Sequence, residues 1–175
     1  MLSEKELITC LKTILVEQVH FQTYQELQIT SKHIDLQRMI NQDQFRIDLA
    51  AISHIDSSIH FFEAETQLHI KHPVLYIKFC DYCYLVCPEE QFDILDSITK
   101  KQQLSWADET GVGVITISKD GALRVRLLAK QQSMLPEVRK EVVRVMNKRY
   151  RIHFTTLPLW ERTRSSQSKG EAQIP

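Results

Sequence analysis

The sequence predicts an α/β domain in which a mixed central sheet is flanked by helices. Apolar residues recur at helical spacing near both ends of the chain, and short apolar runs typical of strands lie between them. A third sign is Asp120-Gly121, a dipeptide that favours a tight hairpin turn. With 175 residues the chain can bury a substantial core, and we expect one domain over residues 1–155.

The first part of the chain is expected to form one helix and three strands. Ser3 can cap a helix that runs to about His20, with acidic residues in its first turn. Strands are expected at about 24–30, 46–52 and 59–65, and the segment 34–40 either extends the first strand or forms a turn. The apolar stripe of the helix comprises Leu7, Leu11, Ile14 and Leu15.

The middle of the chain is expected to alternate between helix and strand. Residues 67–82 have helical spacing, and we expect Pro73 to begin the main helix there. A short buried strand at 83–87 ends at Pro88. One helix should then cover about 89–103, and its inward residues should be Phe92, Leu95 and Ile98.

The last part predicts a hairpin and a helix. Residues 111–117 and 122–128 flank the Asp-Gly turn, which supplies the positive φ that such turns require. A final helix should run from Pro136 to about Tyr150, with Val138, Val142, Val145 and Met146 on its core face. Residues 156–175 form a basic tail that we expect to be disordered.

Three carboxylates stand within or at the end of apolar strands. Asp48 lies inside the second strand, and Glu63 and Glu65 are two residues apart in the third, so both should project to one face. Pairing of the two strands would bring Asp48 to them. Crowded carboxylates are unfavourable unless a cation neutralises them, and hard oxygen ligands suit Mg²⁺ or Mn²⁺. The alternative is that these are solvated charges at strand ends.

This order of elements, with Asp in the second strand and Glu-x-Glu in the third, resembles the PD-(D/E)XK nuclease superfamily. Within it the chain is similar to the MmcB-like family of DNA-repair proteins over about residues 20–150. The resemblance implies a restriction-endonuclease-like αβββαβ core. The matching stretches are Arg46-Ile-Asp48-Leu, Phe62-Glu63-Ala64-Glu65, Tyr76-Ile-Lys-Phe-Cys80-Asp81, Tyr84-Leu-Val-Cys-Pro88, Gly111-Val-Gly-Val-Ile and Asp120-Gly-Ala.

The resemblance implies a metal-dependent nuclease acting on DNA, in repair or restriction. Asp48, Glu63 and the backbone carbonyl of Ala64 would hold Mg²⁺ or Mn²⁺. Glu65 replaces the lysine of the superfamily, so it either completes the metal shell or acts as the general base. Lys71 either substitutes for the missing cation or is a surface lysine. The alternative function is an inactive nuclease-fold module that binds nucleic acid or a protein partner.

Positive charge gathers near the C-terminus although the net charge of the chain is zero. Residues 137–164 contain eight Lys or Arg against three Glu, which indicates either phosphate contacts or an ordinary solvated helix face. DNA is the expected partner, and a homodimer is possible for a nuclease of this fold. The residues assigned to nucleic-acid binding are Arg46, Arg139, Lys140, Arg144 and Lys148.

Other side chains offer weaker signals. The spacing Cys80-x-x-Cys83-x-x-x-Cys87 permits a metal or iron–sulfur site, but buried core thiols are favoured. His69 and His72 either bind a ligand or lie on the surface, and Trp106 and Trp160 either stack on bases or pack partly buried. No apolar run could cross a bilayer and the N-terminus lacks a signal-peptide pattern, so we expect no membrane association and a cytoplasmic protein.

Overall fold

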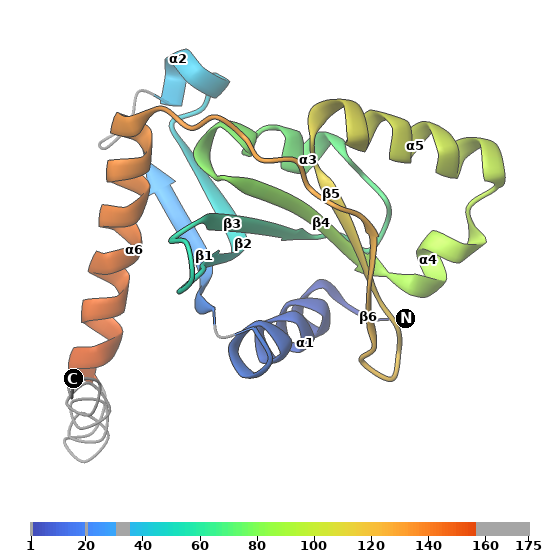
Figure 1. Ribbon diagram of the computed structural model, residues 1–175, viewed down its shortest axis with the longest axis horizontal. Coiled ribbons are helices and arrows are strands. Elements are labelled where there is room, and N and C mark those ends of the chain that lie inside the picture. Colours follow the sequence, from blue (N-terminus) through green and yellow to red (C-terminus); the bar gives the residue numbers. More distant parts are fainter. Residues whose placement is uncertain (1, 20, 31–35, 157–175) are drawn as a thin grey trace.

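The computed structural model describes residues 2–19, 21–30 and 36–156, and it confirms the α/β fold with a mixed sheet flanked by helices (Figure 1). The strands are β1 (Gln22–Thr30), β2 (Gln44–Ile52), β3 (Ile59–Ala64), β4 (Tyr82–Pro88), β5 (Gly113–Ile117) and β6 (Leu123–Leu127). The helices are α1 (Glu4–Glu17), α2 (Leu36–Ile40), α3 (Lys71–Val74), α4 (Glu89–Ile94), α5 (Ser97–Thr110) and α6 (Pro136–Thr156), with a 3-10 turn η1 (Ile77–Phe79).

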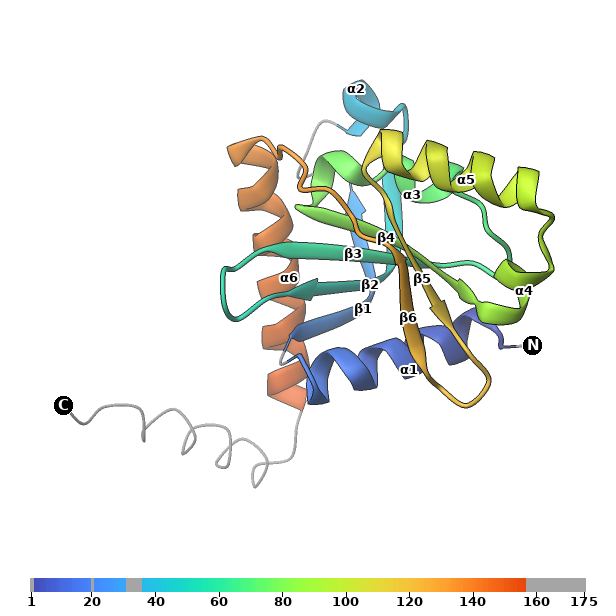
Figure 2. The ribbon, with the colours of Figure 1, turned by 45° about the vertical axis from the view of Figure 1, so that its right-hand side comes forward.

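The sheet has six strands in the order β1-β2-β3-β4-β5-β6. The pairs β1–β2, β2–β3 and β5–β6 are antiparallel, whereas β3–β4 and β4–β5 are parallel. Figure 2 shows α1 lying across one face of the sheet and α6 standing behind the other. The buried side chains agree, because α1 packs with Leu49, Phe62 and Val86, while α6 packs with Ile47 and Phe61.

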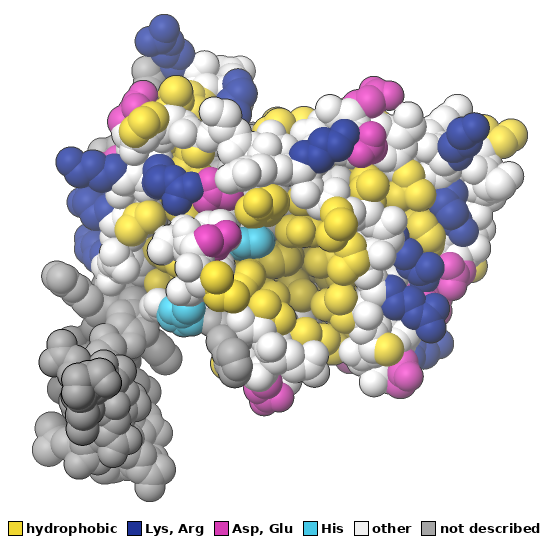
Figure 3. Space-filling model, viewed as in Figure 1, with side chains coloured by type: hydrophobic (Ala, Val, Ile, Leu, Met, Phe, Trp, Pro, Cys, Tyr) yellow, Lys and Arg dark blue, Asp and Glu magenta, His cyan; other side chains and the backbone are white. Residues whose placement is uncertain are grey.

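The face that α1 covers is only partly shielded. The rings of His60 and Tyr82 stack at 4.8 Å between centroids, and Phe62, which packs against α1, stacks on Tyr84 at 5.3 Å. Figure 3 shows hydrophobic side chains gathered at the centre of this view, with Lys and Arg on both flanks. Stacked rings on neighbouring strands stabilise the pairing of β3 with β4.

The connection between β3 and β4 differs from the prediction. The helix expected from Pro73 is replaced by the four-residue α3 and the turn η1. The N–H of Tyr76 bonds to the carbonyl of Pro73, three residues earlier, so the turn tightens rather than continuing as an α-helix. The chain must also begin β4 at once, because the N–H of Asp81 bonds to the carbonyl of Ile59 on β3.

The prediction of a single helix over 89–103 is also wrong. It is broken into α4 and α5, because Leu95 is extended and the carboxylate of Asp96 accepts from the N–H groups of Ile98 and Thr99. This is an N-cap, which starts a new helix. Ile98 therefore points outward, with 69% of its surface exposed, whereas Phe92 is buried as predicted.

Two other segments depart from expectation. Of the segment 34–40, the described part forms the short helix α2 rather than a strand extension or a turn. Helix α6 continues to Thr156, beyond the predicted end near Tyr150, and the rest of the tail lies outside the described residues. The capped first helix is confirmed, because Ser3 and Glu6 form a capping box at the start of α1.

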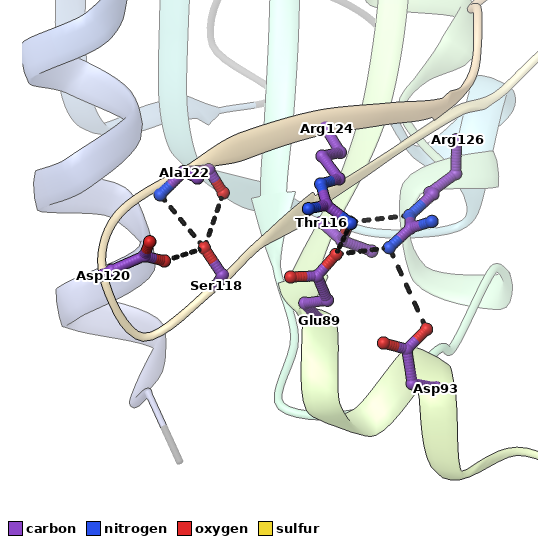
Figure 4. Close-up of polar contacts among 8 residues, drawn as sticks. All are labelled: Glu89, Asp93, Thr116, Ser118, Asp120, Ala122, Arg124 and Arg126. Atoms are coloured by element: carbon purple, nitrogen blue, oxygen red, sulfur yellow. Dashed lines mark hydrogen bonds and ion pairs between the residues drawn. The ribbon is translucent and has the colours of Figure 1, made fainter.

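The β5–β6 hairpin forms as predicted, with Gly121 at φ +85° in its turn. Beside it, Glu89 at the start of α4 accepts from the guanidinium groups of Arg124 and Arg126 (Figure 4). Arg126 Nε also donates to Thr116 Oγ1 at 2.9 Å. These contacts fasten α4 to the hairpin and occupy both arginines.

The cysteines match the prediction made for them. Cys80, Cys83 and Cys87 are buried free thiols, which confirms their assignment to the core. Within the described ranges, no helix is long and apolar enough to span a membrane.

Candidate metal centre

Strands β2 and β3 separate at the point where the carboxylates stand. Their pairing runs from Ile52–Ile59 to Leu49–Phe62 and ends there. The next residues in this register would be Asp48 and Glu63. Asp48 instead turns its carboxylate to β3, and its Oδ2 accepts from the backbone N–H of Ala64 at 3.0 Å. A side chain thus replaces a ladder bond and leaves room between the strands.

A matching irregularity in β1 supports this separation. Glu26, which faces Asp48 in the β1–β2 register, has φ +49° and breaks the regular pairing. The side-chain alternation of β2 changes at the same place, because Ile47 packs on the α6 side and Leu49, two residues later, on the α1 side. An undistorted strand would send both to one face. Asp48 therefore lies at the point where the side-chain alternation of β2 is interrupted.

Glu63 carries a buried carboxyl group next to this interruption in β2. Only 3% of its surface is exposed, and its Oε1 has no hydrogen-bond partner among the described residues. Burial, with a side-chain hydrogen bond and the charge of Asp48, raises the pKa of Glu63 to about 10. A buried charge without a partner is strongly unfavourable. In the absence of a cation Glu63 is therefore neutral at pH 7.

Glu65 follows the end of β3 and is held by α3. Nδ1 of His72 donates to Glu65 Oε1 at 2.8 Å, and the hydroxyl of Tyr76 is hydrogen-bonded to Nε2 of the same ring at 3.2 Å. The chain of contacts fixes the orientation of Glu65. Burial and the nearby acids also raise the pKa of Tyr76, so its phenol stays protonated.

These groups surround one cavity, here called the carboxylate pocket, with a volume of about 410 Å³. Its lining residues are Glu4, Arg46, Asp48, Glu63, Ala64, Glu65, His72 and Tyr76. The structure thus brings together four residues that the sequence assigned to metal binding or catalysis, and it adds Arg46 as a cation at the wall. Glu63 and Glu65 line the same cavity, in agreement with their two-residue spacing.

Lys71 is not brought to the carboxylate pocket. It is the exposed first residue of α3 and lines a neighbouring cavity, while the adjacent His72 faces Glu65. His72, and not Lys71, therefore contacts Glu65. No local pattern in the sequence predicts this contact, because it depends on how α3 turns after β3.

The α6 residues assigned to nucleic-acid binding are not among the residues that line the carboxylate pocket. Arg139 forms an ion pair with the buried Asp81, which also accepts from the N–H of Ile59 at the first residue of β3. Glu63 is near the other end of that strand. Arg144 pairs with Glu141 at 2.7 Å, and Lys140 and Lys148 are exposed. Arg139 therefore holds α6 against the sheet through Asp81, and its assignment to nucleic-acid contact stays a prediction.

Glu4 and Tyr76 line the carboxylate pocket but were not assigned to it from sequence. Tyr76 appeared only within a matched stretch, and Glu4 was considered only for its place in the first turn of α1. Both reach the cavity through tertiary packing, so periodicity could not reveal them.

The oxygen ligands of the carboxylate pocket meet only part of the coordination that a hard divalent cation requires. Among the residues described, no three His, Cys, Asp or Glu side chains are gathered closely enough to hold a metal ion by themselves. Mg²⁺, however, commonly takes one or two carboxylates and completes its shell with water and phosphate oxygens. The paired carboxyls of Asp48 and Glu63, with one buried oxygen unpartnered, match that smaller requirement.

Comparisons with known proteins bear on the fold alone. No protein-family model matches the chain, and no curated protein matches it. Among solved structures, SPO1766 from Silicibacter pomeroyi, a protein of unknown function, is similar with a TM-score of 0.54 and 11% sequence identity. The likeness covers 99% of this chain and 97% of that one, so the two share an architecture over their whole length.

Proposed function

We propose that the protein is a metal-dependent phosphodiesterase that cleaves DNA, with Asp48, Glu63 and the carbonyl of Ala64 holding Mg²⁺ or Mn²⁺. The observation that carries this proposal is the buried Glu63 carboxyl, which has an unpartnered oxygen next to Asp48 at the separation of two strands. A divalent cation there would offset the unfavourable approach of the two acids.

The residues around the carboxylate pocket have distinct parts in this proposal. The Ala64 N–H fixes Asp48 at 3.0 Å, and His72 fixes Glu65 at 2.8 Å. Bound cation would polarise the scissile phosphate and acidify a water molecule. Glu65 can then accept the proton of the attacking water, because it is oriented and remains partly accessible, with 21% of its side chain exposed. Arg46 at the wall suits a phosphate oxygen.

A second candidate function is a nuclease-fold module that binds nucleic acid or a protein without cutting. Two observations favour it: Glu65 stands at the lysine position and is paired with His72, and no ready three-ligand metal cluster is gathered among the described residues. The nuclease takes DNA as its partner, and a homodimer would serve a nuclease that cuts two strands. The free thiols support a reducing, cytoplasmic compartment.

The deciding experiment is calorimetric titration of Mn²⁺ into wild-type protein, Glu63→Ala and Glu17→Gln, followed by cleavage assays on plasmid and single-stranded DNA. Glu17 is an exposed carboxylate at the end of α1 and serves as the matched control. We expect binding and cleavage in the wild type and the control, and neither in Glu63→Ala. DNA binding without Mn²⁺ binding or cleavage in the wild type would favour the module.

A further inference from the structure

A second cavity adjoins the carboxylate pocket and has a volume of about 630 Å³. We call it the α3–α5 pocket, because its walls come from the end of β3, from α3 and from α5. Glu65 and His72 line both cavities. A ligand that enters one of them therefore lies directly against the other.

Helix α5 contributes two side chains from one of its faces. Gln103 and Trp106 are three residues apart, so they are neighbours on the helix surface. Trp106 is half-buried and leaves part of its ring accessible. The Oε1 atom of Gln103 is buried without a hydrogen-bond partner among the described residues. An unpaired buried amide oxygen is unfavourable, and a rotation of the Gln103 side chain toward the cavity would let a ligand N–H satisfy it.

The lining also includes a lysine cation and a further histidine. Lys71 and His69 are both exposed and both line the α3–α5 pocket. Together the lining residues present a flat aromatic ring, an amide able to bond a polar edge, and the ammonium group of Lys71. These are the features that bind the face of a nucleobase, its hydrogen-bonding edge and its phosphate. The volume is within the range of pockets that hold small organic ligands.

We infer that the α3–α5 pocket binds one unstacked nucleotide of a single-stranded segment, with its base against Trp106 and Gln103 and its phosphate near Lys71. The inference rests on the proposed function, because the neighbouring phosphate of the same strand would then reach Asp48 and Glu63. The base must leave its stack to lie on the indole ring, so single-stranded or frayed DNA is the favoured substrate.

The test measures binding without metal, so that it does not depend on cleavage. The probe is a 5′-phosphorylated tetramer of thymidylate in EDTA, compared with an abasic tetramer of equal charge. Trp106 is followed by fluorescence in a Trp160→Phe background, since the chain has two tryptophans. We expect saturable quenching by the thymidylate tetramer and little by the abasic one. Equal quenching by both would contradict a base-binding pocket.

Affinities are then compared by anisotropy of a labelled tetramer. We expect Trp106→Leu to weaken binding about tenfold or more, and Gln103→Met to weaken it about fivefold. Gln102→Met is the matched control, because Gln102 is the exposed neighbour on the same helix. Lys71→Ala adds a variant at an exposed position where folding is not at risk. Unchanged affinity in the Trp106, Gln103 and Lys71 variants would overturn the inference.

Cleavage in Mn²⁺ separates this inference from the proposed function. If the wild type cleaves DNA but the pocket variants bind the tetramer normally, the pocket inference is wrong and the nuclease stands. If the tetramer binds through Trp106 but the wild type does not cleave, the nucleotide pocket is supported and the nuclease proposal is wrong.

Discussion

Asp48 reaches across from β2 to accept a hydrogen bond of 3.0 Å from the backbone N–H of Ala64 on β3. The contact lies where the pairing of these strands ends at Leu49–Phe62. One oxygen of the carboxylate is thereby engaged in holding the sheet together. Asp48, which is proposed to bind metal, therefore also stabilises the sheet. Substitutions can separate its effect on stability from its effect on activity.

Asp48→Ala and Asp48→Asn should differ in their free energies of unfolding, but both should lose cleavage activity. Alanine removes the acceptor of the Ala64 N–H, so we expect a loss of about 1–2 kcal/mol in the free energy of unfolding. Asparagine retains an amide oxygen in its place and should lose less. Both should abolish Mn²⁺-dependent cleavage. Urea unfolding and a cleavage assay on the same preparations check this, and cleavage by Asp48→Asn would remove Asp48 from the metal site.

The stability of the metal-free protein should fall with pH because of Glu63. Its pKa is about 10 in the folded state and near 4.5 in the unfolded state. Between these values the folded state binds more protons, so stability is lost as pH rises across that window. Glu63→Gln imitates the protonated form. We expect it to melt at least about 3 °C above the wild type at pH 8, and at the same temperature at pH 4.

A melting curve of Glu63→Gln that follows the wild type at both pH values would show that Glu63 is ionised in the folded protein. Glu17→Gln is again the control, since its carboxylate is exposed and should leave the pH profile unchanged.

Breaking the ion pair between Arg139 and Asp81 should destabilise the fold. Asp81 is 4% exposed and also accepts from the N–H of Ile59 at 2.7 Å. Arg139→Gln leaves this buried carboxylate without its cation, and we expect a loss of about 1–3 kcal/mol. Lys140→Gln, at the exposed neighbouring position, should have little effect. Chemical denaturation checks both, and equal stabilities would mean that the pair contributes nothing measurable.

Gly113→Ala should be more damaging than Gly121→Ala. A Cβ at Gly113 would lie 2.3 Å from the ring of Tyr84 and 2.7 Å from the backbone nitrogen of Ala129. At Gly121 the nearest atom is 3.5 Å away, and the strain comes from φ +85° alone. We expect losses of about 3 kcal/mol or more and about 1 kcal/mol, respectively. Thermal melts rank the two, and the reverse order would contradict the tight packing of β4 on β5.

Hydrophobic periodicity predicted most of the fold because most elements expose one face. The stripe of α1, the three strands β1, β2 and β3 and the Asp120-Gly121 hairpin all formed as expected. The secondary-structure predictions that proved wrong did so for local reasons. Apolar spacing suggested one helix through Leu95 and Ile98, whereas the carboxylate of Asp96 caps a new one. An Asp at this position can be recognised in the sequence as a possible N-cap, but the apolar spacing around it predicts a continuous helix instead.

The candidate site was predictable only as far as its residues lie on regular strands. Strand alternation placed Glu63 and Glu65 on one face, and hairpin pairing placed Asp48 near them. The position of Lys71 depended on a helix that proved to be one turn long, so His72 faces Glu65 instead. Tyr76 and Trp106 reach their cavities through packing between distant elements, and a single sequence carries no periodic signal for that.

The strands lie in the sheet in the order in which they occur in the chain. Each new strand therefore pairs with the one made just before it, and no strand has to be inserted between two others. Contacts between near neighbours in sequence lower the entropy lost on closing each loop and favour rapid folding. The β1–β2–β3 meander that holds both carboxylates can thus assemble during synthesis, before α5 and α6 have emerged from the ribosome.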